Sequence, residues 1–380
     1  MSERTFYEFF AGGGMARAGL GQGWRCLFAN DFDPKKAASY AENWGGDVLH
    51  VGDVANVATN QLPGHADLIW ASFPCQDLSL AGNGAGLGGA RSGTFWPFWN
   101  LVKSLRDEKR KPRTIVLENV CGLLTSHGGA DFAALCNAIG DAGYWFGALV
   151  IDAQHFVPQS RPRLFLVAVD QSMNIPGHVI SPYAVDMWHP HRLRTVQATL
   201  PERLRSRWLW FAPPVPKPSA TRLIDIIEDE QTGPCWASEA DTARLLGMMS
   251  PVNRAKIDLV MANRHRSVGA VYKRTRMEAG RKMQRAEVRF DLAGCLRTPG
   301  GGSSRQIIMM IENGRVRSRL MSARETARLM GLPDRYKLPE RYNDAYHLTG
   351  DGVAVPAVRY LAENILLPVL NLREPHIVAA

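Results

Sequence analysis

The first 170 residues alternate short apolar runs with longer stretches in which apolar residues recur every three or four positions. The apolar runs predict strands at residues 5–12, 25–31, 66–73, 114–120, 145–152 and 164–170. The longer stretches predict amphipathic helices, most clearly at residues 34–44, 96–107 and 131–143. Strands that alternate with helices are typical of an α/β fold with a doubly wound sheet, in which ligands bind at the carboxyl ends of the strands.

From about residue 175 the pattern changes. Prolines cluster at residues 211–219, arginines cluster at 192–207 and 273–285, and the alternation of strands and helices is lost. Near the end, residues 322–332 predict a helix opened by a capping box of Ser322 and Glu325, and residues 356–370 predict a last amphipathic helix. The expected organisation is a domain at 1–175, a smaller domain at 176–343, and a segment at 344–380 that returns to the first domain.

The composition adds a charge asymmetry to this picture. Residues 1–171 hold 14 Lys and Arg against 16 Asp and Glu, whereas residues 172–290 hold 19 against 11. A basic region beside a near-neutral one favours a polyanion-binding surface joined to a catalytic body, although a generally basic surface gives the same numbers. The six cysteines form no CxxC pair, which argues against a zinc site or a disulfide framework. No apolar run approaches a membrane span, and we expect a cytosolic protein.

Candidate cofactor residues follow the first three predicted strands. Glycines at 12–14 follow the first strand, where a backbone without side chains can approach a ligand closely. Asp31 ends the second strand and can bind ribose hydroxyls, Phe32 can stack on a purine, and Asp53 can bind an adenine amine. Without GxGxxG or a P-loop, this pattern indicates an adenosine-containing cofactor other than a dinucleotide or a nucleoside triphosphate. Turn glycines and helix caps are the alternative reading.

Candidate catalytic residues follow the later strands. Cys75 lies just past the fourth strand and ahead of a glycine-rich loop, as a nucleophile under a lid does. Glu118 ends the next strand, and another strand leads to Arg161 and Arg163. Because these strand ends meet at one edge of the sheet, a thiol, an acid and two guanidinium groups are expected close together.

With these residues identified, the chain resembles the cytosine C5 DNA methyltransferases of bacterial restriction-modification systems. The resemblance rests on ordered blocks between residue 6 and about 360: FFAGGGMARAGL, NDFD, GDV, FPCQDLS, GTFW, ENV, QSRPR, SARETARLMGLPD and GDGVAVPAV. It implies a Rossmann-like methyltransferase sheet in residues 1–175 and target recognition in the basic residues 176–343.

The resemblance also implies a mechanism without a metal. The Cys75 thiolate would add to C6 of a cytosine and make C5 nucleophilic. Glu118 would bind N3 and the exocyclic amine, and Arg161 and Arg163 would hold the base and its oxygen. C5 would take the methyl of S-adenosylmethionine, leaving S-adenosylhomocysteine. The cofactor-binding residues implied are Phe10, Ala11, Gly12, Gly14, Asp31, Phe32, Asp53, Val54, Pro74, Phe95, Asp351 and Val353.

Double-stranded DNA is the partner that the resemblance implies. The target cytosine must leave the duplex, so residues 79–93 are expected to close on DNA. The expected DNA contacts are Ser79, Arg297, Gly300, Gly301 and Arg305. The resemblance further implies a monomer, and leaves open whether a restriction endonuclease acts on the same site.

The chain departs from the family pattern at Glu8, Met15, Asp351 and the pair Ala71-Ser72. Asp351 would place an extra charge beside the cofactor. Two alternatives remain from the sequence: an RNA methyltransferase acting on transfer RNA, against which the long basic segment argues, and a catalytically inactive DNA-binding relative, against which the retained Cys75, Glu118 and Arg163 argue.

Overall fold

The protein consists of two compact units, each built from separate stretches of chain. The structure, a computed structural model, describes residues 3–74, 92–228, 234–263, 265–278, 280–298 and 304–372. The first unit comprises Met1–Ile151, Pro162–Val215 and Ala357–Ala380, and the second comprises Asp152–Arg161 and Pro216–Pro356. Each unit is described by itself.

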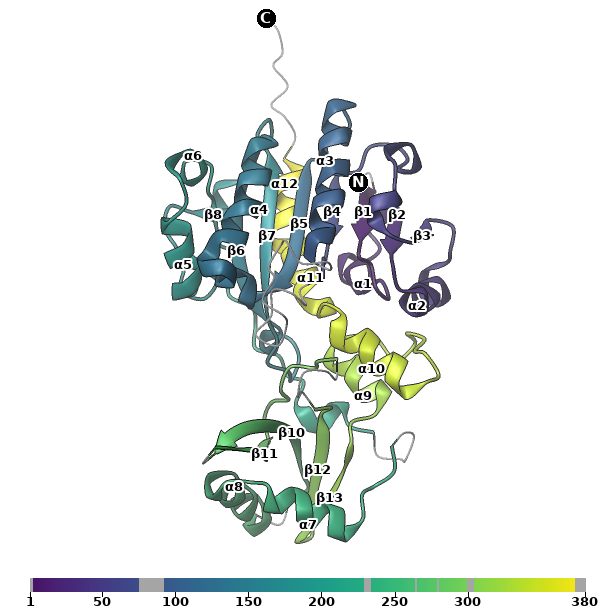
Figure 1. The fold of residues 1–380 in the computed structure, drawn as a ribbon, viewed down its shortest axis with the longest axis vertical. Coiled ribbons are helices and arrows are strands. Elements are labelled where there is room, and N and C mark those ends of the chain that lie inside the picture. Colours follow the sequence, from purple (N-terminus) through teal and green to yellow (C-terminus); the bar gives the residue numbers. More distant parts are fainter. Residues whose placement is uncertain are drawn as a thin grey trace, which may run out of the picture. The chain divides into compact units, whose positions relative to one another are not determined.

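The first unit is built on a seven-stranded sheet (Figure 1) with the order β3-β2-β1-β4-β5-β7-β6. Strands β1 to β5 run parallel, and β7 is antiparallel to β5. The order reverses between β1 and β4, which is the place where open α/β sheets bind ligands. The expected α/β class with a doubly wound, Rossmann-like sheet is confirmed. The strands are β1 (Arg4–Phe9), β2 (Trp24–Asp31), β3 (Leu49–Val51), β4 (Leu68–Ala71), β5 (Thr114–Val120), β6 (Tyr144–Asp152) and β7 (Pro162–Asp170).

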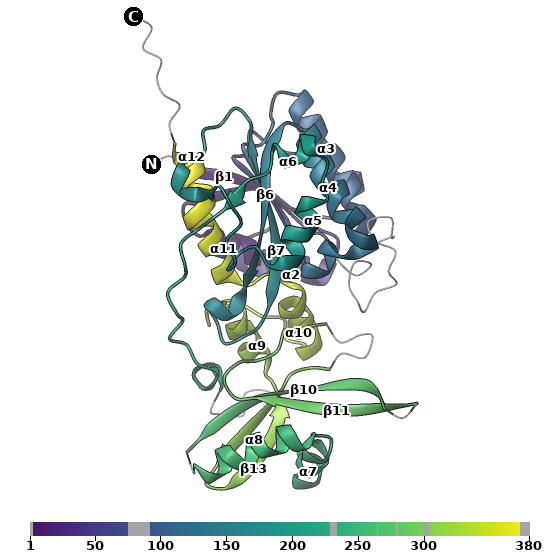
Figure 2. The same ribbon diagram turned by 90° about the vertical axis from the view of Figure 1, so that its left-hand side faces the viewer.

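Helices cover both faces of this sheet. Figure 2 shows α3 and α4 on one face and α11 and α12 on the other. The α3 side is rich in aromatic side chains, and its core includes Phe9, Phe98, Trp99 and Phe132. The helices of the unit are α1 (Met15–Leu20), α2 (Pro34–Trp44), α3 (Phe95–Asp107), α4 (Ala130–Asp141), α5 (His191–Ala198), α6 (Glu202–Arg205), α11 (Val355–Leu361) and α12 (Leu367–Asn371), the last two joined by a π-helical turn.

The compact units have other bounds than the domains expected from the sequence. Residues up to 215 stay with the first unit, because Leu193 and Val196 of α5 and Leu204 of α6 pack into its core. A short pair of strands, β8 (Ile180–Ser181) and β9 (Trp210–Phe211), lies in the same region. The return to the first unit occurs at Ala357 instead of residue 344, and residues 152–161 belong to the second unit.

The second unit contains a four-stranded antiparallel sheet with the order β11-β10-β12-β13. Its strands are β10 (Ser267–Glu278), β11 (Arg281–Arg289), β12 (Ile307–Glu312) and β13 (Arg315–Leu320). Leu245 of α7 (Glu239–Gly247) and Ile257 of α8 (Pro251–Ala262) pack with Val271, Val288 and Met309 of the sheet. The remaining helices are α9 (Ala323–Leu329) and α10 (Tyr342–Asp351). The sequence pattern did not predict this sheet.

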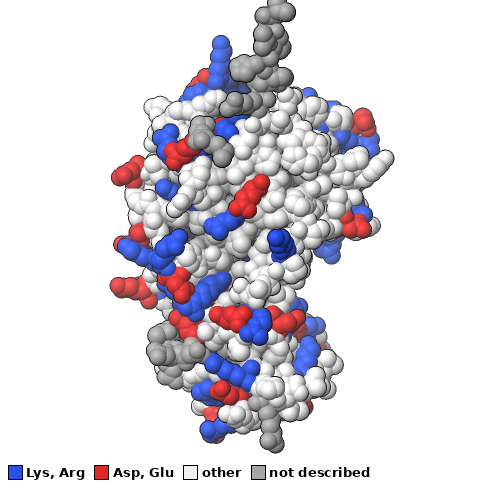
Figure 3. Space-filling model, turned by 180° about the vertical axis from the view of Figure 1, so that it is seen from behind, with Lys and Arg blue, Asp and Glu red and all other residues white. Residues whose placement is uncertain are grey.

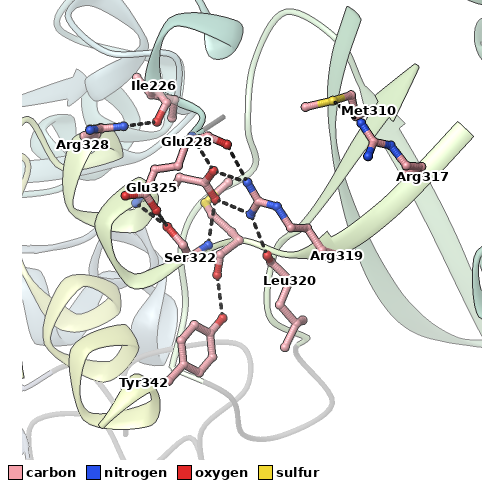
Figure 4. Close-up of polar contacts among 11 residues, drawn as sticks. Ile226, Glu228, Met310, Arg317, Arg319, Leu320, Ser322, Glu325, Arg328 and Tyr342 are labelled. Carbon is pink, nitrogen blue, oxygen red and sulfur yellow. Dashed lines mark hydrogen bonds and ion pairs between the residues drawn. The ribbon is translucent and has the colours of Figure 1, made fainter. Parts of the chain in front are cut away.

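A buried polar network joins β13 to α9 (Figure 4). Arg319 donates to both carboxylate oxygens of Glu325, at 2.6 and 2.8 Å, and the two side chains are 5% and 0% exposed. Ser322 and Glu325 form the predicted capping box, which is thereby confirmed. Glu325 also accepts from the backbone N–H of Glu228 at 2.9 Å, so one carboxylate fixes the start of α9, the end of β13 and the segment before residue 229.

The inserted residues 152–161 are tied into the second unit by their own polar groups. The Gln159 side chain donates to the carbonyl of Leu329 at 2.8 Å and accepts from the N–H of Leu296 at 3.0 Å. The N–H of Arg161 donates to the Asp152 side chain at 2.7 Å. This short insertion therefore packs as an integral part of the second unit.

Residues Tyr342–Asn371 are the one stretch of the described residues whose length and hydropathy match those of a membrane-spanning helix. The helical path is broken between Asp351 and Val355, and 61% of its most apolar window is buried within the protein. Buried core helices have the same character.

Candidate active site

The loop after β1 is shaped by residues with positive φ. Phe10, Gly12 and Gly14 have φ angles of 57°, 55° and 76°. A Cβ at Gly14 would lie 2.4 Å from Nε1 of Trp44, whose N–H donates to the carbonyl of Gly13 at 3.1 Å. A Cβ at Gly12 would meet nothing within 4 Å. Gly14 is therefore required by its packing against α2, while the backbone at Gly12 is left open for a ligand.

Asp31 anchors this loop to the end of β2. Its carboxylate accepts from the N–H of Gly12 at 2.7 Å and from the N–H of Asp33 at 2.9 Å. Burial raises the pKa of Asp31 above its usual range in spite of these hydrogen bonds. The neighbouring Phe32 is 73% exposed, which is unusual for so large an apolar side chain. The sequence predicted both residues as cofactor ligands, and the structure brings them to the rim beside the glycine loop.

The other candidate cofactor residues of the first unit have varied surroundings. Ala11 is buried, and its N–H donates to the carbonyl of Asn30 at 2.9 Å. Asp53 caps the turn that follows β3 by accepting from the N–H of Ala55 at 2.9 Å, and Val54 in that turn is buried. The ring of Phe95 is fully buried and stacks on Trp99, so this side chain serves the core. Pro74 is half-buried at the exit of β4.

Glu118 and Arg163 meet at the end of β5. Because β7 runs antiparallel to β5, Arg163 at its start lies opposite Val120, two residues after Glu118. Nε of Arg163 lies 3.3 Å from Oε1 of Glu118, and the side chains are 14% and 8% exposed. An acid held next to a guanidinium in a largely buried place can bind both a donor and an acceptor of a planar base.

Asn119, for which the sequence predicted no role, connects this pair to the segment that follows β4. Its side-chain amide donates to the carbonyl of Phe73 at 3.1 Å and accepts from the N–H of Val120 at 2.9 Å. Phe73 lies two residues before Cys75, which falls outside the described residues. The only signal in the sequence was the position of Asn119 directly after a predicted catalytic acid.

Arg161 has surroundings that differ from those of Arg163, although only one residue separates them. Its guanidinium is buried and donates to the carbonyls of Leu296, Gly350 and Gly352 at 2.8, 2.9 and 2.5 Å. These contacts, all within the second unit, tie three backbone segments together. They support a structural role in place of the base-binding role that the sequence suggested.

Glu8, one of the departures from the family pattern, is a buried acid. It lies on β1, accepts from the N–H of Arg17 at 3.4 Å, and has a second carboxylate oxygen without a hydrogen-bond partner. Burial raises the pKa of Glu8 to about 8. Arg17 itself binds the hydroxyl of Tyr40 at 3.0 Å and lies over the ring of Trp44, so Glu8 belongs to the packing behind the glycine loop.

The remaining predicted residues belong to the second unit or lie outside the described residues. Arg297 is exposed, and Arg305 donates to Asn343 at 2.5 Å and lies over the ring of Tyr342. Asp351 accepts from the hydroxyl of Thr298, and Val353 is buried. The place of these two in a cofactor site stays a prediction. Cys75, Ser79, Gly300 and Gly301 fall outside the described residues, as do most of the lid at 79–93. Among the described residues, no group of three or more His, Cys, Asp and Glu side chains could hold a metal ion.

Comparison with known proteins gives consistent matches over almost the entire chain. The type II methyltransferase M.HhaI of Haemophilus parahaemolyticus is 24% identical over 364 residues, which cover 95% of this chain and 93% of that protein. M.MspI of Moraxella sp is 25% identical over 376 residues, covering 98% and 73%. The solved structure of S. pombe Dnmt2 methyltransferase superposes with a TM-score of 0.61 at 17% identity, covering 97% of this chain and 99% of that one, which establishes similarity of fold alone.

A model of the family described as C-5 cytosine-specific DNA methylase matches residues 4–367. The match includes both units and every strand end discussed above. The protein belongs to the C-5 cytosine-specific DNA methylase family.

Proposed function

We propose that this protein transfers a methyl group from S-adenosylmethionine to C5 of a cytosine in duplex DNA and releases S-adenosylhomocysteine. The type II methyltransferases to which the chain is similar support this activity. The observation that carries the proposal is the Glu118–Arg163 pair, because an acid and a guanidinium meet at the end of β5, next to the strand that leads to Cys75.

In the proposed reaction, the Cys75 thiolate adds to C6 of the cytosine and breaks the aromaticity of the ring, which makes C5 nucleophilic. Glu118 binds N3 and the exocyclic amine and stabilises the charge that develops on attack, and Arg163 binds the oxygen of the base. After C5 has accepted the methyl group, C5 loses its proton and the Cys75 thiolate leaves. Asn119 holds the exit of β4 in register with Glu118 through the carbonyl of Phe73.

The residues around the glycine loop fit S-adenosylmethionine. The exposed face of Phe32 suits an adenine ring, and Asp31 keeps lone pairs for ribose hydroxyls beyond the two backbone bonds that it accepts. Gly12 leaves the backbone open to a ligand, and Asp53 follows the neighbouring strand. When bound, S-adenosylmethionine supplies an electrophilic methyl group.

The second unit is proposed to recognise the DNA target, and Asp351 and Val353 are proposed as further cofactor-binding residues. We further propose that the enzyme acts as a monomer in the cytosol, either with a restriction endonuclease of the same specificity or as a solitary methylase. Monomeric action fits a reaction performed separately on each strand.

The test is to incubate wild-type protein and a Cys75→Ser variant with labelled S-adenosylmethionine and, separately, duplex DNA of mixed sequence or transfer RNA. The expected result is label in DNA as 5-methylcytosine with the wild type and none with the variant. Label only in transfer RNA would favour an RNA methyltransferase, and DNA binding without any label would favour an inactive binding protein.

A further inference from the structure

The strands β10 and β11 form a two-stranded ribbon that continues beyond the rest of their sheet (Figure 2). β10 pairs with β12 only from Ser267 to Val271, whereas its pairing with β11 continues to Glu278. Residues 272–278 and 281–287 therefore pair only with each other, and no third strand lies beside them. Such ribbons fit the grooves and the backbone of duplex DNA.

The two faces of the ribbon carry different side chains, because successive residues of a strand point to opposite sides. Cross-strand partners share a face, so the pairing register assigns every residue. The arginine face contains Tyr272, Arg274, Arg276, Glu278, Arg281, Met283, Arg285 and Glu287. The lysine face contains Lys273, Thr275, Met277, Lys282, Gln284 and Ala286.

The lysine face continues into the side of the sheet that helices cover. Val271 and Val288, which belong to this face, pack in the core with Leu245 of α7 and Ile257 of α8. The N–H of Ala286 donates to the carbonyl of Met248 at 3.1 Å. A ligand approaching this face would meet the α7–α8 layer beside it.

The arginine face lies on the opposite side, together with the segment that contains Arg297. A Cβ placed on Gly294 would lie 3.5 Å from Cδ1 of Tyr272, so the segment runs beside the first residue of the arginine face. Arg297 follows three residues later and is exposed. The arginine face therefore lies on the side of the sheet opposite the α7–α8 layer, and residue 294 approaches its first residue.

Carboxylates hold the arginines of this face without neutralising them all. Glu287 lies 2.7 Å from Arg276 and 3.8 Å from Arg274, and Glu278 accepts from Nε of Arg285 at 2.9 Å. Four arginines face two glutamates, and Arg274 and Arg276 remain 52% and 54% exposed. Each guanidinium has five N–H donors, so an arginine that binds a glutamate can bind a phosphate as well.

Charge counting alone does not identify such a surface. In the view of Figure 3, Lys and Arg lie among Asp and Glu instead of forming one continuous positive patch. On the ribbon, moreover, Lys273 and Lys282 make no ion pair with the described residues, so unpaired charge by itself would favour the lysine face. The arginine face is favoured because it lies on the side of the sheet opposite the α7–α8 layer.

We propose that the arginine face of the β10–β11 ribbon binds the phosphate backbone of duplex DNA, with the lysine face turned away. This inference rests on the proposed function and names the element through which the second unit holds its substrate. The arginines position the protein on DNA, and the glutamates fix the orientation of the guanidinium groups.

The test compares two double variants of the full chain that each remove two positive charges. Arg274→Ala with Arg276→Ala changes the arginine face, and Lys273→Ala with Lys282→Ala changes the lysine face. Binding of duplex DNA is measured by fluorescence anisotropy from about 50 to 200 mM salt. The arginine variant should weaken binding at least tenfold and lower the steepness of log Kobs against log salt by about 2, since each lost phosphate contact changes it by about 0.9. The lysine variant should retain the wild-type steepness.

A third variant, Glu287→Gln, separates DNA contact from a structural effect. It removes a negative charge from the arginine face but keeps both arginines, so it should strengthen DNA binding a few-fold. A ribbon that merely needed its ion pairs for folding would bind DNA more weakly in both the Glu287 and the arginine variants. Equal losses in the arginine and lysine variants, or a dependence on Arg274 and Arg276 seen only with transfer RNA, would overturn the inference.

Failure of this inference is distinct from failure of the proposed function. Wild-type protein that methylates DNA while the arginine variant binds DNA like the wild type rejects the ribbon alone. Wild-type protein that methylates no DNA, but binds it through Arg274 and Arg276, rejects the proposed activity alone.

Discussion

The two units place charged side chains in opposite ways. In the first unit, Glu118 and Arg163 are 8% and 14% exposed and are positioned by the register of β5 and β7. In the second unit, Glu287 and Arg276 are 24% and 54% exposed on a ribbon that water reaches from both faces. Burying an ion pair costs desolvation free energy, so removing one partner of a buried pair has a large effect. An exposed pair contributes little free energy by itself, so exposed charges matter mainly when several act together. Single substitutions should therefore be decisive in the first unit.

The largest effect is expected from replacing Glu118, the buried acid of the first unit, by Gln. The variant keeps the shape of the side chain but cannot transfer a proton to N3 as negative charge develops on the ring during attack. We expect methyl transfer to fall about 100-fold to 10,000-fold while cofactor binding is retained. Single-turnover methylation and calorimetric titration with S-adenosylmethionine check the two parts.

The matched control is Glu202→Gln on α6 of the same unit, where the side chain is 79% exposed and pairs with Arg205. This variant should methylate at the wild-type rate. Comparable losses in both variants would show that burial at the strand end does not set the importance of a carboxylate here.

The second unit has its own buried ion pair, Arg319 with Glu325. It tests whether the effect of a substitution depends on the exposure of the side chain or on the unit to which it belongs. Arg319→Ala leaves Glu325, with 0% exposure, without its cation, and should reduce the free energy of unfolding by about 3–5 kcal/mol. Arg317→Ala on the same strand removes an exposed arginine 3.9 Å from Glu312, and should cost about 1 kcal/mol or less. Both arginines lie over the ring of Trp236, so the loss of this contact is common to the pair. Urea unfolding curves of equal slope but unequal midpoint would give the difference; equal midpoints would contradict it.

The last comparison concerns the buried acid Glu8 and depends on pH. Its pKa of about 8 in the folded protein is raised above the 4.5 of an ordinary glutamate, so folding takes up a proton between these values. Stability is fully present below pH 4.5 and is lost as pH rises through about 8, at about 1.4 kcal/mol per pH unit in between. Glu8→Gln should abolish this contribution, which denaturant titrations at several pH values would detect. Parallel pH profiles for the two proteins would mean that Glu8 ionises freely in the folded state.

Much of the first unit could be predicted because its elements bury one face or both. The predicted helix at residues 34–44 is α2, whose bounds are Pro34–Trp44, and every predicted strand overlaps an observed one. The chemistry at the ends of β1, β2 and β5 followed from the same pattern, since parallel strands bring their ends to one edge. The antiparallel direction of β7 could not be predicted, because a run of apolar residues has the same pattern in a parallel and in an antiparallel strand.

The ribbon and the role of Arg161 were not predictable in this way. Outside residues 267–272, β10 exposes both faces, so its sequence shows arginines and no alternation of apolar and polar positions. Arg161 and Arg163 belong to one short motif, but only the fold determines that Arg161 meets backbone carbonyls and Arg163 meets Glu118. Contacts between residues distant in sequence decide such roles.

The path of the chain has a consequence for synthesis on the ribosome. The chain crosses from one unit to the other four times, at residues 151/152, 161/162, 215/216 and 356/357. The first unit needs α12, whose Asn371 accepts from Arg4 of β1 at 2.6 Å, so its sheet stays uncovered on one side until the last helix emerges. The nascent sheet must therefore be protected while about 140 residues of the second unit are being translated. Exchanging the second unit between relatives would likewise require internal insertions at fixed crossing points, since stretches of the first unit lie on both sides of it in the chain.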